Sequence, residues 1–485
     1  MLPFLCLVIL CGVLTQNAQG YDNPLAIASL SPQLLQQLIS HRMNTQELKD
    51  RLQGLPLEDV IKKGAREGNR GGGFLSGIPL LGGLLNNVIG NILGVKINNV
   101  ELLKLNIGFD EREAKIIVTI PADIELELKL PLNLFSRLLH LKLYLDIQVG
   151  VRVDRDPSTG HVRLIIGNCH NTPGHLRITV LDNANFVVRT VNNVVKLVTD
   201  VLEKTLPHLL QKELCPLVNG VVQNVLDLLQ GAFNSEMHGE RVQFLPESFD
   251  VHDGSFNLAY QGLMQRPGGQ REVIRPDSVP LSAVPLEGSS MNMVLSSNYL
   301  SSAVRALLPP QSFNFDIASQ GEGAAFRQQI AAVLPEASNV RMLQIASGVP
   351  SLSLTVGKIQ LWQQIKIRFF TEHLTRDYRP LFILRATVAF TVHPSVIDGK
   401  MILALHSVRI QNLQLVNSDR HFDVQRMANL IAQLVSTSLL PHQNKSLAVG
   451  IPLPLVQNLG LRSLHVTVGK DAVMIVPSGE VPVSA

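Results

Sequence analysis

The sequence predicts an α+β fold made of two similar halves, each with a strongly curved antiparallel sheet or barrel and a long apolar helix. Three observations lead to this fold class. A long alternating run predicts a strand that must curve, and an apolar helix pattern follows it. The same order of strands, helix and proline then returns in the second half of the 485 residues. We interpret the two halves as a diverged internal duplication.

The alternating run extends over residues 139–153 and has an apolar residue at every odd position. Successive side chains of a strand point to opposite faces of its sheet, so a period of two predicts a strand with one buried face. At about 3.3 Å per residue such a strand reaches roughly 50 Å, a length that must twist and coil. Its apolar face consists of Leu139, Leu141, Leu143, Leu145, Ile147, Val149, Val151 and Val153. A shorter alternating run at 124–130 predicts a neighbouring strand.

A helix pattern begins near Asn185 and is expected to end at Pro207, because proline breaks or kinks a helix. Valine is a poor helix former, so this helix depends on burial of its apolar side. The apolar positions are Val187, Val188, Val191, Val194, Val195, Val198, Val201 and Leu202. A second apolar helix is predicted at 217–229.

The second half repeats this order. Short helices are predicted at 300–308 and 326–334, and Asp398-Gly399 is typical of a hairpin turn. A helix pattern at 424–435 is expected to end before Pro441, as the first half's does at Pro207. Alternating strands are predicted at 352–356, 359–361, 365–369, 386–392 and 401–410.

The first twenty residues have the pattern of a secretory signal, with an apolar core at 5–14 and small residues at Ala18-Gln19-Gly20. A secreted, extracellular protein of about 465 residues is therefore expected. No later segment is apolar enough to predict a membrane span. We predict a first barrel at 21–245, a proline-rich linker or central sheet at 246–290 and a second barrel at 291–485.

Two cysteines, Cys169 and Cys215, remain after the signal is removed. An even pair in a secreted chain predicts one disulfide. It would close a loop of 215 − 169 = 46 residue steps and stabilise the fold by roughly 3–4 kcal/mol. The alternatives are a bond that only stabilises the fold and one that holds a helix across the sheet of a ligand container.

Charge argues against nucleic acid as a partner. Residues 21–250 contain 23 Lys and Arg against 25 Asp and Glu, a net charge of −2, and residues 251–485 contain 19 against 14, a net charge of +5. Phosphate neutralisation needs a concentrated basic face, which neither half has in sequence.

Hydrophobic residues make up 46% of the chain. Large cores or an apolar ligand site must account for them.

The motifs of an enzyme are missing. The sequence has no Gly-x-Ser-x-Gly elbow, no His-Glu-x-x-His and no dinucleotide glycine fingerprint. His170, His175 and His208 lie near the cysteines without metal-ligand spacing. We therefore expect no catalysis, no cofactor and no metal.

Asn444-Lys445-Ser446 is a glycosylation sequon, expected in an exposed loop after Pro441.

Several short motifs resemble the bactericidal/permeability-increasing protein (BPI) family, and most closely the long PLUNC branch of its family B. They include Glu213-Leu214-Cys215-Pro216 after a valine-rich helix, Asn168-Cys169, and Leu440-Pro441-His442-Gln443-Asn444. Gly450-Ile451-Pro452-Leu453-Pro454-Leu455 and Lys470-Asp471-Ala472-Val473 complete the set. The resemblance covers nearly the whole mature chain.

This resemblance implies a boomerang of two barrels joined by a central sheet, with the disulfide at Cys169 and Cys215. It also implies apolar pockets that hold phospholipid or another amphipathic lipid, in innate mucosal defence or lipid transport. Bacterial lipopolysaccharide is a further candidate ligand, although the negative first half predicts no cationic tip. The expected pocket wall is Leu141, Leu143, Leu145, Val191, Val194, Val195, Val198 and Leu202.

Two alternatives remain open at this point. The same wall residues could fill a closed core. The chain could also be a secreted surface-active or matrix protein with vestigial pockets, because the Gly/Leu-rich segment 71–92 is typical of a mobile apolar loop at an interface.

Overall fold

The computed structural model describes residues 24–59, 94–181 and 209–477, apart from short gaps within the last two ranges. The predicted signal, the helix predicted from residue 185 and the segment 71–92 lie outside the described residues. The chain divides into two compact units. The N-terminal unit contains Ser31–Gln230 and Phe249–Phe256, and the C-terminal unit contains Gly231–Ser248 and Asn257–Ser484 with the strand that ends at Leu30.

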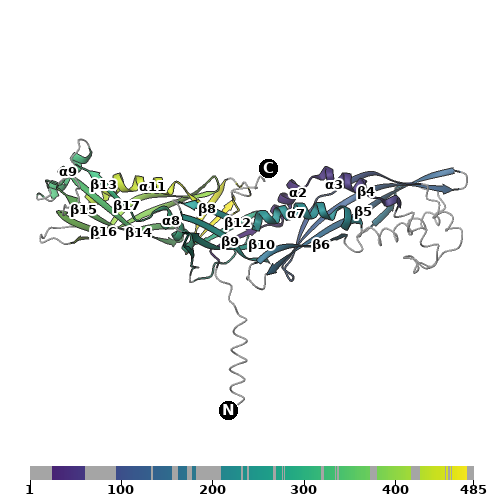
Figure 1. The fold of residues 1–485 in the computed structure, drawn as a ribbon, viewed down its shortest axis with the longest axis horizontal. Helices are drawn as coiled ribbons and strands as arrows, with labels where there is room; N and C mark the ends of the chain where they lie inside the picture. The colour runs from purple at the N-terminus through teal and green to yellow at the C-terminus, as the bar shows by residue number, and fades with distance from the viewer. Residues whose placement is uncertain are drawn as a thin grey trace, which may run out of the picture. The chain divides into compact units, whose positions relative to one another are not determined.

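The N-terminal unit is built on an antiparallel six-stranded sheet (Figure 1). The predicted strand at 139–153 is confirmed as part of a longer strand, and its odd-numbered residues are buried from Leu139 to Val151. The main path of the sheet is β2 (Gly94–Leu102), β4 (Lys115–Leu132), β5 (Phe135–Arg155) and β6 (Val162–Asn171), with β3 (Asn106–Asp110) on β4 and β7 (Arg177–Val180) on β5.

Helices α2 (Pro32–Arg42), α3 (Thr45–Gln53) and α7 (Cys215–Gln230) pack in this unit. Ser31 caps α2, since its Oγ accepts a hydrogen bond from the backbone N–H of Leu34 at 3.1 Å. The predicted helix at 217–229 is confirmed as α7. Its buried stripe of Val218, Val222, Val225, Leu226 and Leu229 follows helical spacing and packs against β6 and α2.

The C-terminal unit contains a second antiparallel six-stranded sheet. The hairpin at Asp398-Gly399 is confirmed, with φ of 49° and 71° at the two turn residues, as a two-residue turn requires. The strand order is β13 (Ser312–Asp316), β14 (Met342–Thr355), β15 (Lys358–Phe370), β16 (Phe382–Ile397), β17 (Lys400–Val416) and β18 (Ile451–Pro452).

In the described part of this unit the α-helices are α8 (Ser297–Leu307), α9 (Glu322–Val333), α10 (Ala428–Leu434) and α11 (Leu440–Leu447). The expectation that the last helix ends before Pro441 is wrong. A π-helical turn at Val435–Leu439 joins α10 to α11, and Pro441 lies in the first turn of α11. A proline there has no intrahelical donor to lose, so the helix continues.

A third, eight-stranded sheet includes two strands that the sequence pattern does not reveal. β1 (Ala26–Leu30) and β12 (Met291–Ser296) are buried at every residue, so neither alternates. The order is β19 (Leu464–Val468), β20 (Ala472–Pro477), β12, β1, β10 (Ser255–Gln265), β9 (Glu240–His252) and β8 (Phe233–Met237), with β11 (Arg271–Val273) on β10. The predicted α+β class with large antiparallel sheets is confirmed.

Candidate functional site

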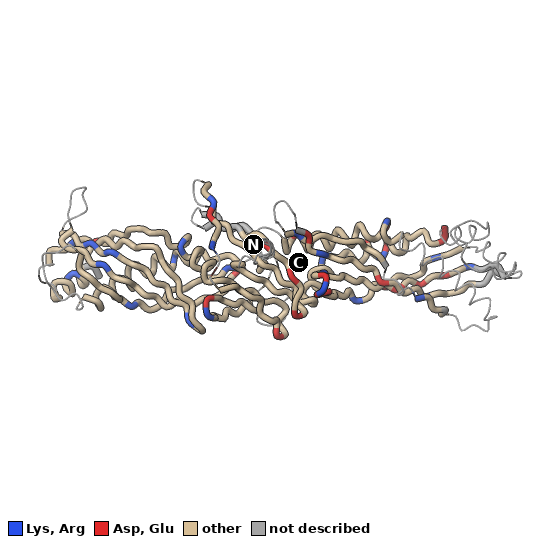
Figure 2. The backbone as a smooth tube through the Cα atoms, turned by 90° about the horizontal axis from the view of Figure 1, so that it is seen from below, with Lys and Arg blue, Asp and Glu red and all other residues tan. Residues whose placement is uncertain are grey.

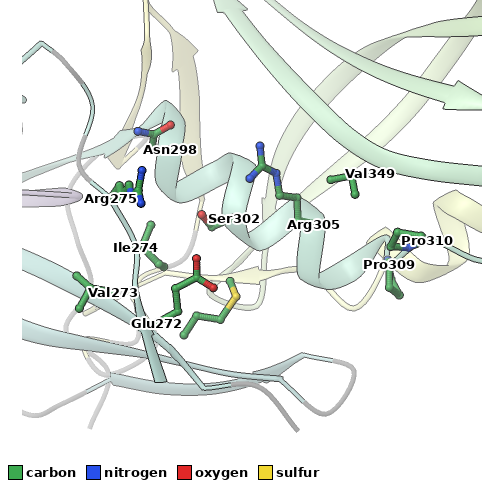
Figure 3. Close-up of a pocket in the computed structure, with 11 residues that line it drawn as sticks. Glu272, Val273, Ile274, Arg275, Asn298, Ser302, Arg305, Pro309, Pro310 and Val349 are labelled. Atoms are coloured by element: carbon green, nitrogen blue, oxygen red, sulfur yellow. The ribbon is translucent and has the colours of Figure 1, made fainter. Parts of the chain in front are cut away.

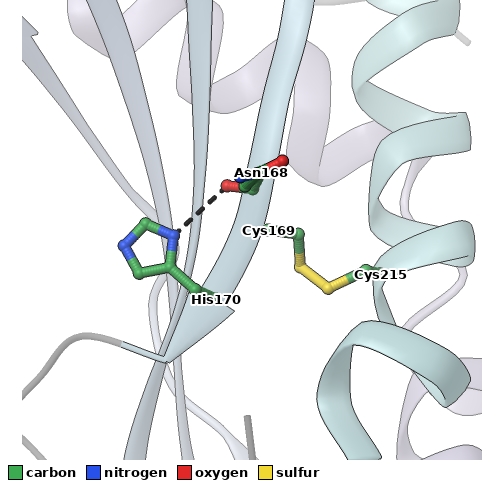
Figure 4. Close-up of a disulfide and its surroundings, with 4 residues drawn as sticks. All are labelled: Asn168, Cys169, His170 and Cys215. Atoms are coloured by element: carbon green, nitrogen blue, oxygen red, sulfur yellow. Dashed lines mark hydrogen bonds between the residues drawn. A yellow bond between two sulfur atoms is a disulfide. The ribbon is translucent and has the colours of Figure 1, made fainter. Parts of the chain in front are cut away.

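The disulfide joins strand β6 to the first residue of helix α7 (Figure 4). The Cα atoms of Cys169 and Cys215 are 5.6 Å apart, and both side chains are buried. His170 lies on the opposite face, and its Nδ1 is 3.2 Å from the carbonyl oxygen of Asn168. The bond therefore holds α7 against the sheet, which both sequence alternatives allow.

The predicted pocket wall is described in part. Leu141, Leu143 and Leu145 lie on one face of β5, and each is completely buried. Their partners on β4 are Leu126, Ile124 and Ala122, so the apolar face continues across the sheet. The other wall residues, Val191, Val194, Val195, Val198 and Leu202, lie outside the described residues.

The other face of β4 and β5 carries paired charges. The Lys142 ammonium is 2.7 Å from the Asp123 carboxylate, and this hydrogen bond and its charge raise the pKa of Lys142. The Tyr144 hydroxyl donates to Asp146 at 2.7 Å, which together with partial burial raises the pKa of Tyr144. Charge on this face is balanced locally.

A pocket of about 580 Å³ lies in the C-terminal unit, beside helix α8 (Figure 3). This volume is in the range of small-molecule sites. Asn298, Ser302 and Arg305 occur at i, i+4 and i+7 and so share one face of α8. The remaining lining residues are Met264, Glu272, Val273, Ile274, Arg275, Pro309, Pro310 and Val349.

The wall of the pocket opposite α8 is segment 274–277, and hydrogen bonds hold it at both ends. The Ile274 N–H donates to the carbonyl of Gly262 at 2.9 Å, and a Cβ at Gly262 would lie 3.0 Å from the Ile274 side chain. The Asp277 carboxylate accepts from the Ser297 hydroxyl at 3.1 Å and from the Asn298 N–H at 3.4 Å. The segment after β11 is thus fixed to the start of α8, a favourable place for a carboxylate.

The pocket is amphipathic. Arg275 and Arg305 are exposed, and their guanidinium groups form no ion pair or hydrogen bond with any residue that the structure describes. Val273 and Val349 are 59% and 58% exposed beside them, so the lining offers apolar surface as well as charge. Sequence analysis missed this site because its lining comes from β10, β11, α8 and β14, and no single segment has a motif.

Asn444 is not in a loop, which corrects the sequence expectation. It lies in α11, where its side-chain amide bonds both backbone groups of Leu405 in β17, at 2.8 Å and 3.1 Å. The helix continues past Pro441, so the sequon is helical. Glycosylation of Asn444 stays a prediction, and a glycan on Nδ2 would compete with the bond to Leu405.

Within the described ranges, no three His, Cys, Asp or Glu side chains are grouped to hold a metal ion. No helix in those ranges is long and apolar enough to cross a membrane.

Comparisons with known proteins confirm the resemblance found in the sequence. The model of the LBP / BPI / CETP family N-terminal domain matches residues 38–225, and that of the C-terminal domain matches residues 292–476. Human BPI fold-containing family B member 1 is 26% identical over 97% of this chain and 96% of its own length. BPI fold-containing family A member 1 from Bos taurus is 32% identical over 48% of this chain and 95% of its own length.

Among solved structures, lipopolysaccharide binding protein matches with a TM-score of 0.50 at 15% identity, covering 95% of this chain and all of that one. At this identity the match concerns the fold alone.

Proposed function

The chain belongs to the LBP / BPI / CETP family, and we propose on this basis that it is a secreted protein that holds phospholipid or a related amphipathic lipid. Bacterial lipopolysaccharide is a candidate ligand, and innate mucosal defence is the proposed setting. The observation that carries the proposal is the amphipathic pocket beside α8.

The pocket offers both parts of an amphipathic lipid a partner. A guanidinium donates paired hydrogen bonds to phosphate or carboxylate, and Arg275 and Arg305 form no ion pair or hydrogen bond with the described residues, although the Glu272 carboxylate also lines the pocket. Val273, Val349 and Met264 supply apolar surface for the first part of an acyl chain. Each buried methylene contributes about 0.8 kcal/mol.

A second apolar space is proposed in the N-terminal unit. Leu141, Leu143 and Leu145 would form one wall, and Val191, Val194, Val195, Val198 and Leu202 the facing one. The uninterrupted apolar face of β5 supports this assignment, whereas its complete burial is what the closed-core alternative predicts. The disulfide at Cys169 and Cys215 would keep the helical side of that space in position.

We propose a binding role without catalysis. Among the described residues, the lining of the pocket beside α8 contains no His or Cys, so Ser302 has no imidazole partner there. The surface-active alternative depends on segment 71–92, which lies outside the described residues.

Titration of the purified full-length protein with a fluorescent phosphatidylglycerol tests the pocket. The double substitution Arg275→Gln and Arg305→Gln is expected to weaken binding about tenfold or more, since each charged hydrogen bond contributes about 1.5–3 kcal/mol. Arg271→Gln is the matched control, because Arg271 belongs to β11 but does not line the pocket. Equal affinities for all three proteins would refute this site, and absence of any uptake would refute lipid binding.

A further inference from the structure

The outward face of strands β14 to β17 in the C-terminal unit is cationic, and an acid of the same sheet, Asp316, lies on the edge strand β13. Strands β14, β15, β16 and β17 include no Asp or Glu in their sequences. Figure 2 shows Lys and Arg along this sheet without intervening acidic positions. The outward cations include Lys358, Lys366, Arg368, Arg385 and Arg409.

Two of these cations are directly opposite each other. Lys366 on β15 is in register with Arg385 on β16, and Arg368 is the next outward residue after Lys366, about 6.6 Å along the strand. Like charges at opposed positions destabilise a sheet. The side chains of Lys366 and Arg385 form no ion pair or hydrogen bond with other described residues. The arrangement therefore has an energetic cost with no internal compensation.

The equivalent sheet of the N-terminal unit avoids this cost. There Lys142 is in register with Glu125 and forms its ion pair with Asp123 at 2.7 Å. His140 is in register with Glu127, with 3.7 Å between Nε2 and the carboxylate. An antiparallel sheet of this kind can thus pair its outward charges internally. The uncompensated outward charge on β14–β17 therefore indicates binding of an external anion.

Amides and one aromatic ring accompany the cations. Trp362 is in register with Ala389, which is in register with Arg409, so the indole, a small residue and a guanidinium form one outward row. Gln414 extends the row of Lys366 and Arg385. Arg368 donates to Gln344, which donates to Asn314 at 3.1 Å.

We propose that this face binds a sulfated linear polysaccharide. Sulfate groups would pair with the Lys and Arg side chains, hydroxyl groups with the amides, and one sugar ring would stack on Trp362. Successive outward residues repeat at about 6.6 Å along a strand, so a polysaccharide lying along the strands meets a donor in nearly every row.

An anionic bilayer fits this face less well. Surface-bound proteins insert apolar side chains among the lipids, but the outward positions here are mostly Gln, Thr, Ser, Ala and the cations. The exposed aliphatic residues nearby, Val356 and Ile397, are at the hairpin ends of the strands.

Isothermal titration of the full-length protein tests the proposal with three probes: a heparin dodecasaccharide, the same saccharide after desulfation, and vesicles containing phosphatidylserine. The decisive variant is Lys366→Glu, which places a carboxylate opposite Arg385. We expect at least about a tenfold loss of affinity for the dodecasaccharide with an unchanged or higher urea midpoint. Trp362→Ala is expected to weaken binding at any salt concentration, whereas the charge contribution falls as salt rises.

The pocket variant Arg305→Gln is the matched control and should keep full affinity for the dodecasaccharide. Affinity that survives Lys366→Glu, equal affinity for the desulfated saccharide, or binding to vesicles alone would each overturn the proposal. Because the control separates the two sites, failure here leaves lipid binding beside α8 unaffected.

Discussion

The side chain of Asn444 in α11 takes the place of a neighbouring strand for Leu405 in β17. Its Oδ1 accepts from the Leu405 N–H at 2.8 Å, and its Nδ2 donates to the Leu405 carbonyl oxygen at 3.1 Å. The register of β17 with β18 is limited to Lys400 and Met401, so Leu405 has no strand partner on that side. One amide thus joins the helix to the sheet and satisfies two backbone groups.

Replacing Asn444 by Ala should destabilise the protein by about 1–3 kcal/mol, because both Leu405 groups lose their partner. Urea unfolding of protein secreted from eukaryotic cells measures this. Ser446→Ala is the control, since it removes the sequon and keeps the amide. Equal destabilisation by the two substitutions would mean that a glycan, and not the amide, stabilises this region.

Removing the disulfide with Cys169→Ala and Cys215→Ala should cost about 4 kcal/mol in the chain-entropy model, for a sequence separation of 46 residues. Chemical denaturation with and without reductant measures the change. Reduction of the unmodified protein should give the same shift and have no effect on the double variant. If reductant leaves the denaturation midpoint of the unmodified protein unchanged, the prediction is contradicted.

The Tyr299 hydroxyl donates to the carbonyl oxygen of Pro452 at 2.8 Å in a fully buried position, and its ring packs edge-on against Phe244. Tyr299→Phe should therefore cost about 1–2 kcal/mol at neutral pH. The substitution leaves the ring contacts in place, so a larger loss would point to rearrangement of the core.

Burial raises the pKa of Tyr299 and of Tyr260. In the unfolded chain these tyrosine hydroxyls ionise near pH 10, whereas in the folded chain they stay protonated. The free energy of unfolding should therefore keep its full value below pH 10 and fall as the pH rises above it. Urea midpoints from pH 8 to 11 test this, and Tyr299→Phe should make the decline shallower. The same decline in both proteins would show that Tyr299 ionises without unfolding.

Much of the fold follows from local pattern. Residues 139–153 predict β5 because one face is buried and the other is not, and Asp398-Gly399 predicts the turn between β16 and β17 that the structure contains. β1 and β12 escaped detection because burial on both faces removes the alternation. The Pro441 prediction failed since a π-helical turn precedes it, which local propensity does not encode.

The candidate sites depend on register more than on motif. Lys366 and Arg385 lie on consecutive strands, 385 − 366 = 19 positions apart, and only the register of β15 with β16 shows that two like charges meet. The pocket beside α8 likewise exists only because the tertiary fold brings Val349 of β14 to the same lining as Arg305 of α8. The disulfide was predictable because only two cysteines lie outside the predicted signal.

Lipid occupancy tests the central claim most directly. Native mass spectrometry of the full-length protein, secreted from cells and purified without detergent, should reveal a bound amphipathic lipid that organic extraction then releases for identification. Protein that carries no lipid, and that takes up none when incubated with phospholipid vesicles, would contradict it.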